Sequence, residues 1–310
     1  MGLMRSVLLA MSESPWMRTN MPKMGFVRRA AKRFMPGEDV AAALDATREL
    51  APRRIGTVLT QLGEDIEDEA QATGVRDHYI GVYQRAHADG LNVEISVKLT
   101  QLGLSFAGDT CEQNLVTLAD CARQHSNWLW IDMESTPYTD RTLDHYHRLR
   151  AKFPNVGVCV QAYLYRTEDD LKRLIAAGGH VRLVKGAYRE PPDKAFPKKK
   201  DVDANYFALA KLLLSEDARS KGVRAIFGTH DGALIRRIEE HARATGVPAG
   251  KLEFQMLYGI QRAEQERLAA AGYPFRVLIS YGSAWYAWYM RRLAERPANV
   301  TFVLKNMFSS

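Results

Sequence analysis

Ionisable side chains stand at the ends of short apolar runs in this sequence. Lys98 ends one run, and Asp132 and Glu134 flank a methionine at the end of another. Carboxylates two residues apart on a strand point to the same side, so both can face a barrel axis near Lys98. A desolvated lysine there is suited to forming a Schiff base or to binding an anion. The alternatives are a lysine that extends into water and an ion pair that only stabilises.

A second set of polar residues follows three other runs. Gln161 offers an amide that both donates and accepts hydrogen bonds, which suits the edge of a heterocycle. Arg182 and Lys185 are three residues apart on one run and therefore face opposite ways, and Gly186 allows a ligand to approach the backbone closely. His230 fits an acid, a base or a phosphate contact, with a structural hydrogen-bonding role as the alternative.

Eight such apolar runs organise the chain. They cover residues 55–60, 93–99, 128–133, 156–160, 181–185, 224–227, 252–256 and 275–280. Stretches between most of them, such as 166–177 and 204–220, carry apolar residues at three- and four-residue steps, which predicts helices. Alternating strands and helices imply parallel pairing, and the polar run ends place a site at one end of a (β/α)8 TIM-like barrel. An open doubly wound sheet is the alternative, since it differs only in closure.

Two helices lie outside this alternation. Residues 36–50 predict an extra helix before the first strand that could plug the bottom of the barrel. Residues 284–296 predict a helix after the last strand, and Trp288, Arg291, Arg292 and Glu295 share one of its faces. A face with two guanidiniums is not a core face. We therefore expect one catalytic domain over 36–310 and a poorly ordered extension over 1–35.

The composition is that of an ordinary globular protein, with 46% hydrophobic and 25% charged residues. Three scattered cysteines are too few for a disulfide framework or a cysteine-rich zinc site, and the histidines are not spaced for a metal. Much of the net charge of +7 lies in two basic segments without interleaved aromatic residues, which disfavours nucleic acid. We expect no metal, no secretory signal and no spanning helix, and hence a cytoplasmic protein that is soluble or peripheral to the membrane.

Seven motifs together resemble, in their order along the chain, those of the proline dehydrogenase family. They are Val-Lys-Leu-Thr around Lys98, Ile-Asp-Met-Glu around Asp132, Val-Gln-Ala-Tyr around Gln161, Arg-Leu-Val-Lys-Gly-Ala-Tyr from Arg182, Gly-Thr-His-Asp from Gly228, Glu-Phe-Gln-Met-Leu-Tyr-Gly from Glu253 and Trp-Tyr-Met-Arg-Arg-Leu-Ala-Glu from Trp288. The chain is similar to a monofunctional bacterial member, because no aldehyde dehydrogenase half follows. Neither a Gly-x-Gly-x-x-Gly motif after a strand nor a P-loop is present, so a redox cofactor would be bound by the barrel itself.

The resemblance implies a distorted barrel with FAD at its top and a displaced last helix that acts as a lid. It implies oxidation of L-proline to 1-pyrroline-5-carboxylate by hydride transfer from C5 to flavin N5, in the first step of proline catabolism, with a quinone as electron acceptor. The implied catalytic residues are Asp132, which orients the substrate-binding cation, and Arg182, near flavin N5. The implied substrate-binding residues are Lys98, Tyr188, Leu257, Leu278, Trp288, Arg291, Arg292 and Glu295. The implied cofactor-binding residues are Met133, Gln161, Arg182, Val184, Lys185, Gly186, Ala187, Thr229 and His230.

Three positions depart from the family's pattern. Leu278 and Trp288 stand where the family commonly has tyrosines near the substrate ring, and Arg189 replaces an aromatic residue. A hydroxyproline-preferring enzyme of the same family is therefore an alternative. Two others are a Schiff-base aldolase that uses Lys98 or Lys185 and a basic peripheral membrane or RNA adaptor without flavin. With a membrane quinone as the electron acceptor, we hypothesise that the basic N-terminus contacts the anionic inner face of the membrane.

Overall fold

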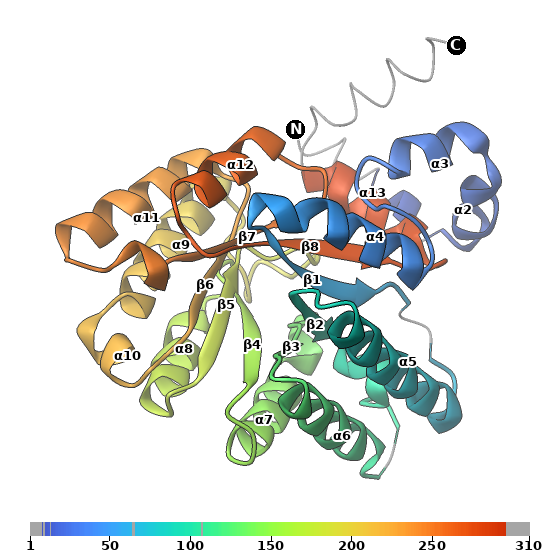
Figure 1. Ribbon diagram of the computed structural model, residues 1–310, viewed down its shortest axis with the longest axis horizontal. Helices are drawn as coiled ribbons and strands as arrows, with labels where there is room; N and C mark the ends of the chain where they lie inside the picture. The colour runs from blue at the N-terminus through green and yellow to red at the C-terminus, as the bar shows by residue number, and fades with distance from the viewer. Residues whose placement is uncertain (1–7, 9, 13, 64–65, 107, 296–310) are drawn as a thin grey trace.

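The protein is a closed barrel of eight parallel strands surrounded by helices, as the computed structural model in Figure 1 shows. The structure describes residues 8, 10–12, 14–63, 66–106 and 108–295. The strands are β1 (Gly56–Gln61), β2 (Val93–Val97), β3 (Leu129–Ile131), β4 (Val156–Gln161), β5 (His180–Val184), β6 (Ala225–Gly228), β7 (Glu253–Leu257) and β8 (Phe275–Tyr281). Because β8 pairs with β1 from Arg276 opposite Gly56 to Tyr281 opposite Gln61, the barrel prediction is confirmed and the open sheet is excluded.

Each predicted apolar run became a strand because both faces of a parallel sheet are covered. The helices outside the N-terminal segment are α4 (Val40–Leu50), α5 (Glu69–Ala88), α6 (Thr110–Gln124), α7 (Thr139–Arg150), α8 (Thr167–Ala176), α9 (Lys199–Leu213), α10 (Glu216–Ser220), α11 (Gly232–Ala244), α12 (Arg262–Ala270) and α13 (Trp285–Glu295). The single helix predicted over 204–220 is divided between α9 and α10. The side chain of Ser215 accepts a hydrogen bond from Ala218 N and thereby starts the second helix.

The helix predicted over 36–50 is α4, and the expectation that it plugs the barrel bottom is wrong. Thr47 Oγ1 of α4 lies 3.0 Å from Thr57 Oγ1 on the outward face of β1. The helix packs along β1 and β8, in the outer position that a helix following β8 would normally take (Figure 1).

The last helix, α13, is displaced over the carboxyl end of the barrel, as predicted. Its Trp288 belongs to one apolar cluster with Leu62, which follows β1, and with Ile260, which follows β7. These two residues come from connections at the carboxyl ends of their strands. A helix that contacts both therefore covers the barrel mouth.

N-terminal helices cover the other side of α13. They are α2 (Pro15–Asn20), α3 (Gly25–Ala31) and a 3-10 turn over Met21–Lys23, and Figure 1 shows them beside α13. Phe34 and Tyr289 have ring centroids 5.9 Å apart, and Trp285 Nε1 donates to Glu38 Oε1 at 3.1 Å. Residues 1–7, 9 and 13 lie outside the described residues, and the poor order expected for 1–35 stays a prediction.

The floor of the barrel, at the amino ends of the strands, is built from charged side chains. Glu94, Arg224, Glu253 and Arg276, here called the floor cluster, come from or adjoin four strands. Arg224 Nη2 lies 2.8 Å from Glu94 Oε1 and 2.7 Å from Glu253 Oε2, and Arg276 Nη2 lies 3.0 Å from Glu94 Oε1. Two cations therefore balance two anions inside the barrel, which keeps the desolvated charges paired.

A side chain joins the backbones of β1 and β2 beyond their paired residues. The register of the two strands runs from Thr57 opposite Val93 to Leu59 opposite Ile95. Beyond it the buried phenol of Tyr79, from α5, accepts a hydrogen bond from Gln61 N at 2.8 Å. The same hydroxyl donates to Ser96 O at 3.4 Å, so a side chain completes the backbone bonding where the two strands separate.

Candidate active site

A buried ionic group lies in the middle of the barrel, above the floor cluster. Arg182 Nη2 of β5 donates both to Asp132 Oδ1 and, at 2.7 Å, to Ser96 Oγ of β2. Ser96 Oγ in turn donates to Asp132 Oδ1 at 2.8 Å. Arg182 Nη1 reaches Gln255 Oε1 of β7 at 3.4 Å. Four strand regions therefore converge on one guanidinium.

The environment keeps Arg182 charged. Burial acts against the charged form, but the Asp132 carboxylate opposes it, and overall the pKa of Arg182 is raised. The Arg182 side chain is 3% exposed and that of Asp132 is 21% exposed. The carboxylate therefore lies on the side of the pair nearer to solvent. A fixed positive charge in a site of low dielectric can stabilise negative charge that develops on a bound group.

Residues at the carboxyl ends of β4, β5 and β6 lie beyond this pair, toward the barrel mouth. Val184 and Gly228 are register partners, and a Cβ at Gly228 would lie 2.9 Å from Val184 Cγ1. Gly186 has a φ of +113°, and a Cβ there would overlap the ring of Tyr163. Gln161 is 3% exposed and its Oε1 has no hydrogen-bond partner. A buried amide oxygen without a partner fits a hydrogen-bond donor at the edge of a heterocycle, so the residues present suit a flavin ring.

Several residues are expected to surround the substrate. Those whose side chains the structure describes lie at the same mouth of the barrel. Lys98 directly follows β2 and is 9% exposed. Leu257 and Leu278 are register partners on β7 and β8, and Leu257 packs against the apolar cluster that contains Trp288 of α13. Arg292, half-buried, follows on the same helix. The side chains of Arg291 and Glu295, like that of Ala294, lie outside the described residues.

Other predicted residues follow β5, β6 and β3. Tyr188 and Ala187 are half-buried, in the connection after β5. Thr229 is buried, and its hydroxyl accepts a hydrogen bond from Asp231 N at 3.2 Å. Met133 is buried, and its carbonyl accepts from Gln161 Nε2 at 3.3 Å.

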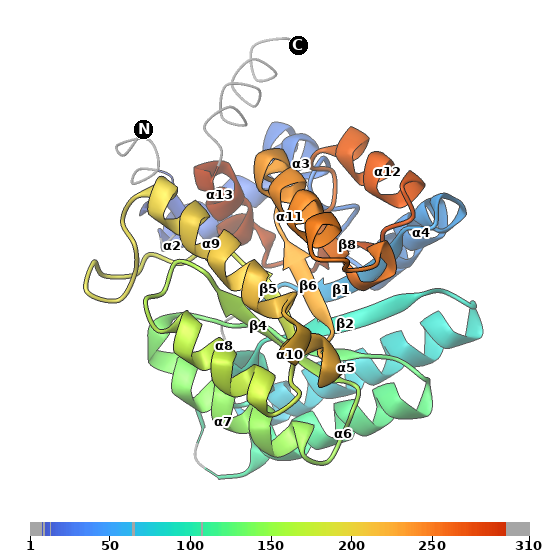
Figure 2. The same ribbon diagram turned by 90° about the vertical axis from the view of Figure 1, so that its left-hand side faces the viewer.

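Two predicted residues are engaged with the fold itself. Lys185 Nζ lies 2.5 Å from Asp203 Oδ1 of α9 and 2.8 Å from Asp231 Oδ2, which precedes α11. Figure 2 shows these two helices side by side outside the sheet. The Lys185 side chain therefore points away from the Arg182 group. His230 Nε2 accepts a hydrogen bond from Leu257 N at 2.9 Å, which ties the end of β6 to that of β7.

Sequence reasoning missed three residues of the central group. Ser96 and Gln255 contact Arg182 directly, and the guanidinium carbon of Arg182 lies 5.6 Å from the ring centroid of Trp130. A parity signal was present for each. Ser96 is two residues before Lys98, Trp130 is two before Asp132 and Gln255 is two before Leu257, so each pair faces the same side of its strand.

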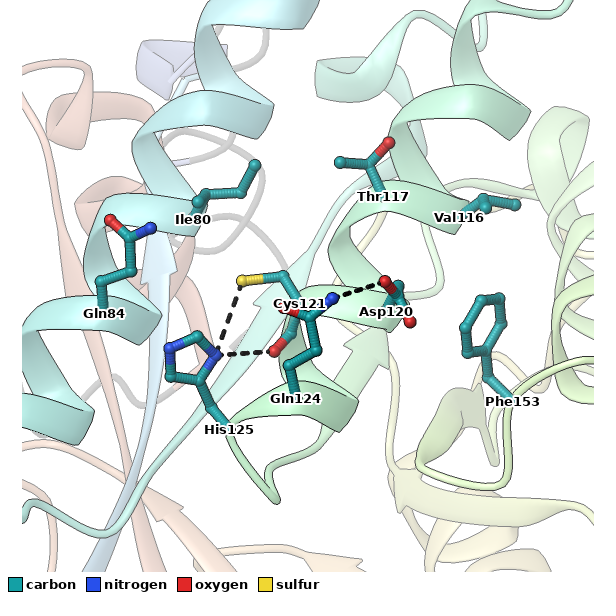
Figure 3. Close-up of a pocket in the computed structure, with 9 residues that line it drawn as sticks. All are labelled: Ile80, Gln84, Val116, Thr117, Asp120, Cys121, Gln124, His125 and Phe153. Carbon is teal, nitrogen blue, oxygen red and sulfur yellow. Dashed lines mark hydrogen bonds between the residues drawn. The ribbon is translucent and has the colours of Figure 1, made fainter.

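A surface pocket lies elsewhere, on the outer helical layer between α5 and α6 (Figure 3). Ile80, Val116 and Phe153 are among its lining residues, and His125 Nδ1 lies 3.9 Å from Cys121 Sγ. It is separate from the strand ends. Within the described ranges, no three His, Cys, Asp or Glu side chains are grouped for a metal ion, and no helix is long and apolar enough to cross a membrane.

The closed barrel holds a charged, desolvated group, and a helix covers its mouth. This arrangement is that of a (β/α)8-barrel enzyme with its site at the carboxyl ends of the strands. A family model described as "Proline dehydrogenase" matches residues 43–305. The chain belongs to this family.

Individual relatives agree with the family match. Proline dehydrogenase 1 of Bacillus subtilis (strain 168) is 34% identical over 305 residues, which cover 98% of this chain and 99% of the relative. Proline dehydrogenase of Deinococcus radiodurans is 36% identical over 282 residues, which cover 89% of each chain. A crystal structure of proline utilization A from Bdellovibrio bacteriovorus, inactivated by N-propargylglycine, matches with a TM-score of 0.78 and 25% identity. The match covers 86% of this chain, which spans about a third (32%) of that longer one.

Proposed function

We propose that this protein oxidises L-proline to 1-pyrroline-5-carboxylate with FAD as its cofactor. When bound, FAD would accept the hydride from C5 of proline at its N5 atom. The observation that carries the proposal is the buried Arg182–Asp132 pair, with the unpartnered Gln161 Oε1 at the carboxyl end of β4. Family membership supplies the substrate class, and the site supplies a place where a flavin ring and a charged group can meet.

The chain's own residues would act by positioning and electrostatics. Arg182 would lie next to the reacting edge of the flavin, where its fixed charge favours the electron-rich reduced form. Gln161, with its unpartnered Oε1, would accept a hydrogen bond from the heterocycle. Gly186, Ala187 and Thr229 would border the cofactor. Lys185 would contribute through its backbone, because its ammonium is paired with Asp203 and Asp231.

The substrate would bind between the barrel mouth and α13. Lys98 would bind its carboxylate together with Arg291 and Arg292, because paired guanidiniums hold a planar carboxylate by charge-assisted bonds. Glu295, one turn after Arg291, would fix that guanidinium. The ring would lie against an apolar wall, to which Leu257, Leu278, Trp288 and Tyr188 contribute. With its carboxylate bound and its ring packed, proline would hold C5 in position for hydride transfer. Such positioning is the main requirement of the reaction.

The test is the visible spectrum of the purified protein after incubation with FAD. We expect bound flavin absorbance that bleaches when L-proline is added without oxygen. Lys98→Met should keep the flavin and raise the KM for proline at least tenfold, whereas Lys200→Met, which removes an exposed lysine, should change neither. A protein that binds no flavin, or whose bound flavin L-proline does not reduce, would contradict the proposal.

We also propose a quinone acceptor that is reached at an anionic membrane surface, on the cytoplasmic side. Residues 14–35 contain six Lys or Arg and no Asp or Glu, against a net charge of +7 for the whole chain. In this segment Trp16 is 64% exposed and Met24 is 39% exposed. Basic residues beside exposed apolar side chains favour an anionic bilayer surface.

Vesicle sedimentation tests this contact. We expect binding to phosphatidylglycerol vesicles at low salt, weaker binding to phosphatidylcholine vesicles, and loss of most binding in Trp16→Ala or in the double variant Arg29→Glu and Lys32→Glu. Tyr165→Ala removes another exposed aromatic residue, on the connection after β4, and serves as the control. Equal sedimentation of the wild type with both lipids would rule out an electrostatic contact.

A further inference from the structure

Gln255 connects the floor cluster to the Arg182 group, and neither the family match nor the sequence motifs give it a role. Its side chain is 3% exposed and faces the barrel interior from β7. Gln255 Nε2 donates to Glu253 Oε1 at 3.1 Å, and Gln255 Oε1 accepts from Arg182 Nη1 at 3.4 Å. The amide thus bridges a carboxylate below and a guanidinium above.

The charges on either side fix which way the amide points. If it were rotated by 180°, its oxygen would face the carboxylate of Glu253 and its NH2 group would face the guanidinium of Arg182. Both contacts would be repulsive. The Glu253 carboxylate is itself immobilised, because Arg224 Nε and Nη2 donate to its Oε2 at 2.9 and 2.7 Å. The floor cluster therefore orients Gln255 so that its amide oxygen, and not its NH2 group, faces Arg182.

Packing reinforces this connection. The indole of Trp130 lies between the two arginines, with the guanidinium carbon of Arg182 at 5.6 Å and that of Arg224 at 5.3 Å from its ring centroid. Trp130 Nε1 donates to Glu94 Oε2 at 2.7 Å, so the ring is also anchored to the floor. The guanidinium of Arg182 is thus held by Asp132 and Ser96 on one side and by Gln255 on the other.

We propose that Gln255 is a positioning residue for Arg182, and that Glu253 sets the orientation of its amide. The inference rests on the proposed function, in which the Arg182 charge faces the flavin. With the amide oxygen in place, the guanidinium keeps the orientation that favours the reduced cofactor. Without it, Arg182 keeps Asp132, Ser96 and its contact with Cys159, but its Nη1 loses the acceptor on the side of β7. The charge then acts less strongly on the flavin.

The test is the midpoint potential of the bound flavin, measured by dye-equilibrated reduction. Gln255→Leu should lower this midpoint potential by about 30 mV. For a two-electron couple, that shift lowers the ratio of reduced to oxidised flavin about tenfold at a fixed solution potential. The KM for proline should stay within about threefold of the wild-type value, because the proposed substrate-binding residues lie at the barrel mouth. Gln255→Glu, which places an anion beside Arg182, should shift the ratio in the same direction and further. Asn155→Leu removes an amide that donates to the backbone carbonyls of Ala119 on α6 and of Asn127 rather than contacting Arg182, and it should leave the potential unchanged.

A second comparison tests the dependence on Glu253. Glu253→Gln should shift the potential less than Gln255→Leu, and it should add nothing when both changes are combined, because the two residues act in series. Additive shifts would show that Glu253 acts independently. An unchanged potential in Gln255→Leu would overturn the positioning role while leaving the proposed function intact, provided that L-proline still bleaches the wild-type flavin. Absence of flavin from the wild type would overturn both.

Discussion

Gly157 on β4 leaves the space that the ring of Trp130 on β3 occupies. A Cβ at residue 157 would lie 2.1 Å from Trp130 Cζ3, well inside van der Waals contact. Trp130 is completely buried between Arg182 and Arg224, so it cannot move aside without disturbing both cations. Glycine at residue 157 is thus required for the Trp130 ring to fit inside the barrel.

Gly157→Ala should therefore destabilise the fold. We expect the free energy of unfolding to fall by about 1–3 kcal/mol, the usual cost of overpacking a core, in urea-induced unfolding. Gly81→Ala, in α5, where an added Cβ meets no atom within 4 Å, is the control and should be neutral or slightly stabilising. Equal stability of Gly157→Ala and the wild type would contradict the packing of Trp130.

Asp132→Asn tests the central ion pair. The change leaves the buried guanidinium of Arg182 without its anion, and we expect a loss on the order of 2–4 kcal/mol in the free energy of unfolding. Flavin reduction by proline should slow at least tenfold, because Arg182 is no longer held in place. Asp140→Asn breaks an exposed pair with Arg166 and should cost no more than about 0.5 kcal/mol. A loss in Asp132→Asn no larger than that control would mean that the pair does not hold Arg182.

Stability should depend on the protonation of His180 in mildly acid solution. His180 Nδ1 accepts from Arg224 N, and its Nε2 faces Pro154 O, which fits a neutral ring. Burial, with the cations Arg150 and Arg224, lowers its pKa from 6.5 to about 4. Because the folded pKa lies below the unfolded one, the unfolded chain binds the proton first. Stability should fall as the pH drops from about 6.5 to about 4, by on the order of 2–3 kcal/mol.

The contribution of His180 is measured by unfolding at several pH values. His180→Gln keeps a donor and an acceptor but cannot titrate, so its stability should change less with pH across this window than that of the wild type. His147→Gln, at an exposed position on α7, should keep the wild-type slope. Identical pH profiles for His180→Gln and the wild type would show that another group is responsible.

The ring pocket should prefer proline to trans-4-hydroxy-L-proline. In the proposed substrate pocket, the register partners Leu257 and Leu278 would contribute an aliphatic wall, and a hydroxyl buried against it without a partner costs about 1–3 kcal/mol. We expect kcat/KM to favour proline by about 10–100-fold, and Leu278→Ser to reduce that preference. Leu278→Val, which reduces volume without adding a hydroxyl, is the control. A wild-type enzyme that prefers hydroxyproline would establish the alternative substrate instead.

Much of the barrel and part of the site could be predicted from the sequence because the signals were local. Strands buried on both faces appear as short apolar runs, and strand parity placed Arg182 and Lys185 on opposite sides, as the structure has them. The resemblance supplied the displacement of α13. The substrate and cofactor roles of Lys98, Gln161 and their neighbours stay predictions.

What could not be predicted depends on contacts between distant residues. Arg224 and Glu94 are 130 positions apart, and nothing near either residue in the sequence indicates the other. The role of Gln255 follows only from the carboxylate and the guanidinium on either side of it. The amphipathic pattern of α4 likewise indicates that one face is buried, but it does not indicate which surface covers that face.

The position of α4 has a consequence for the cover of the barrel. The outer site beside β8, which a helix following that strand would normally fill, is occupied by α4. The helix that does follow β8 therefore has no place in the outer ring and lies across the carboxyl ends of the strands instead. A segment that precedes the first strand thus determines where the segment after the last strand can pack.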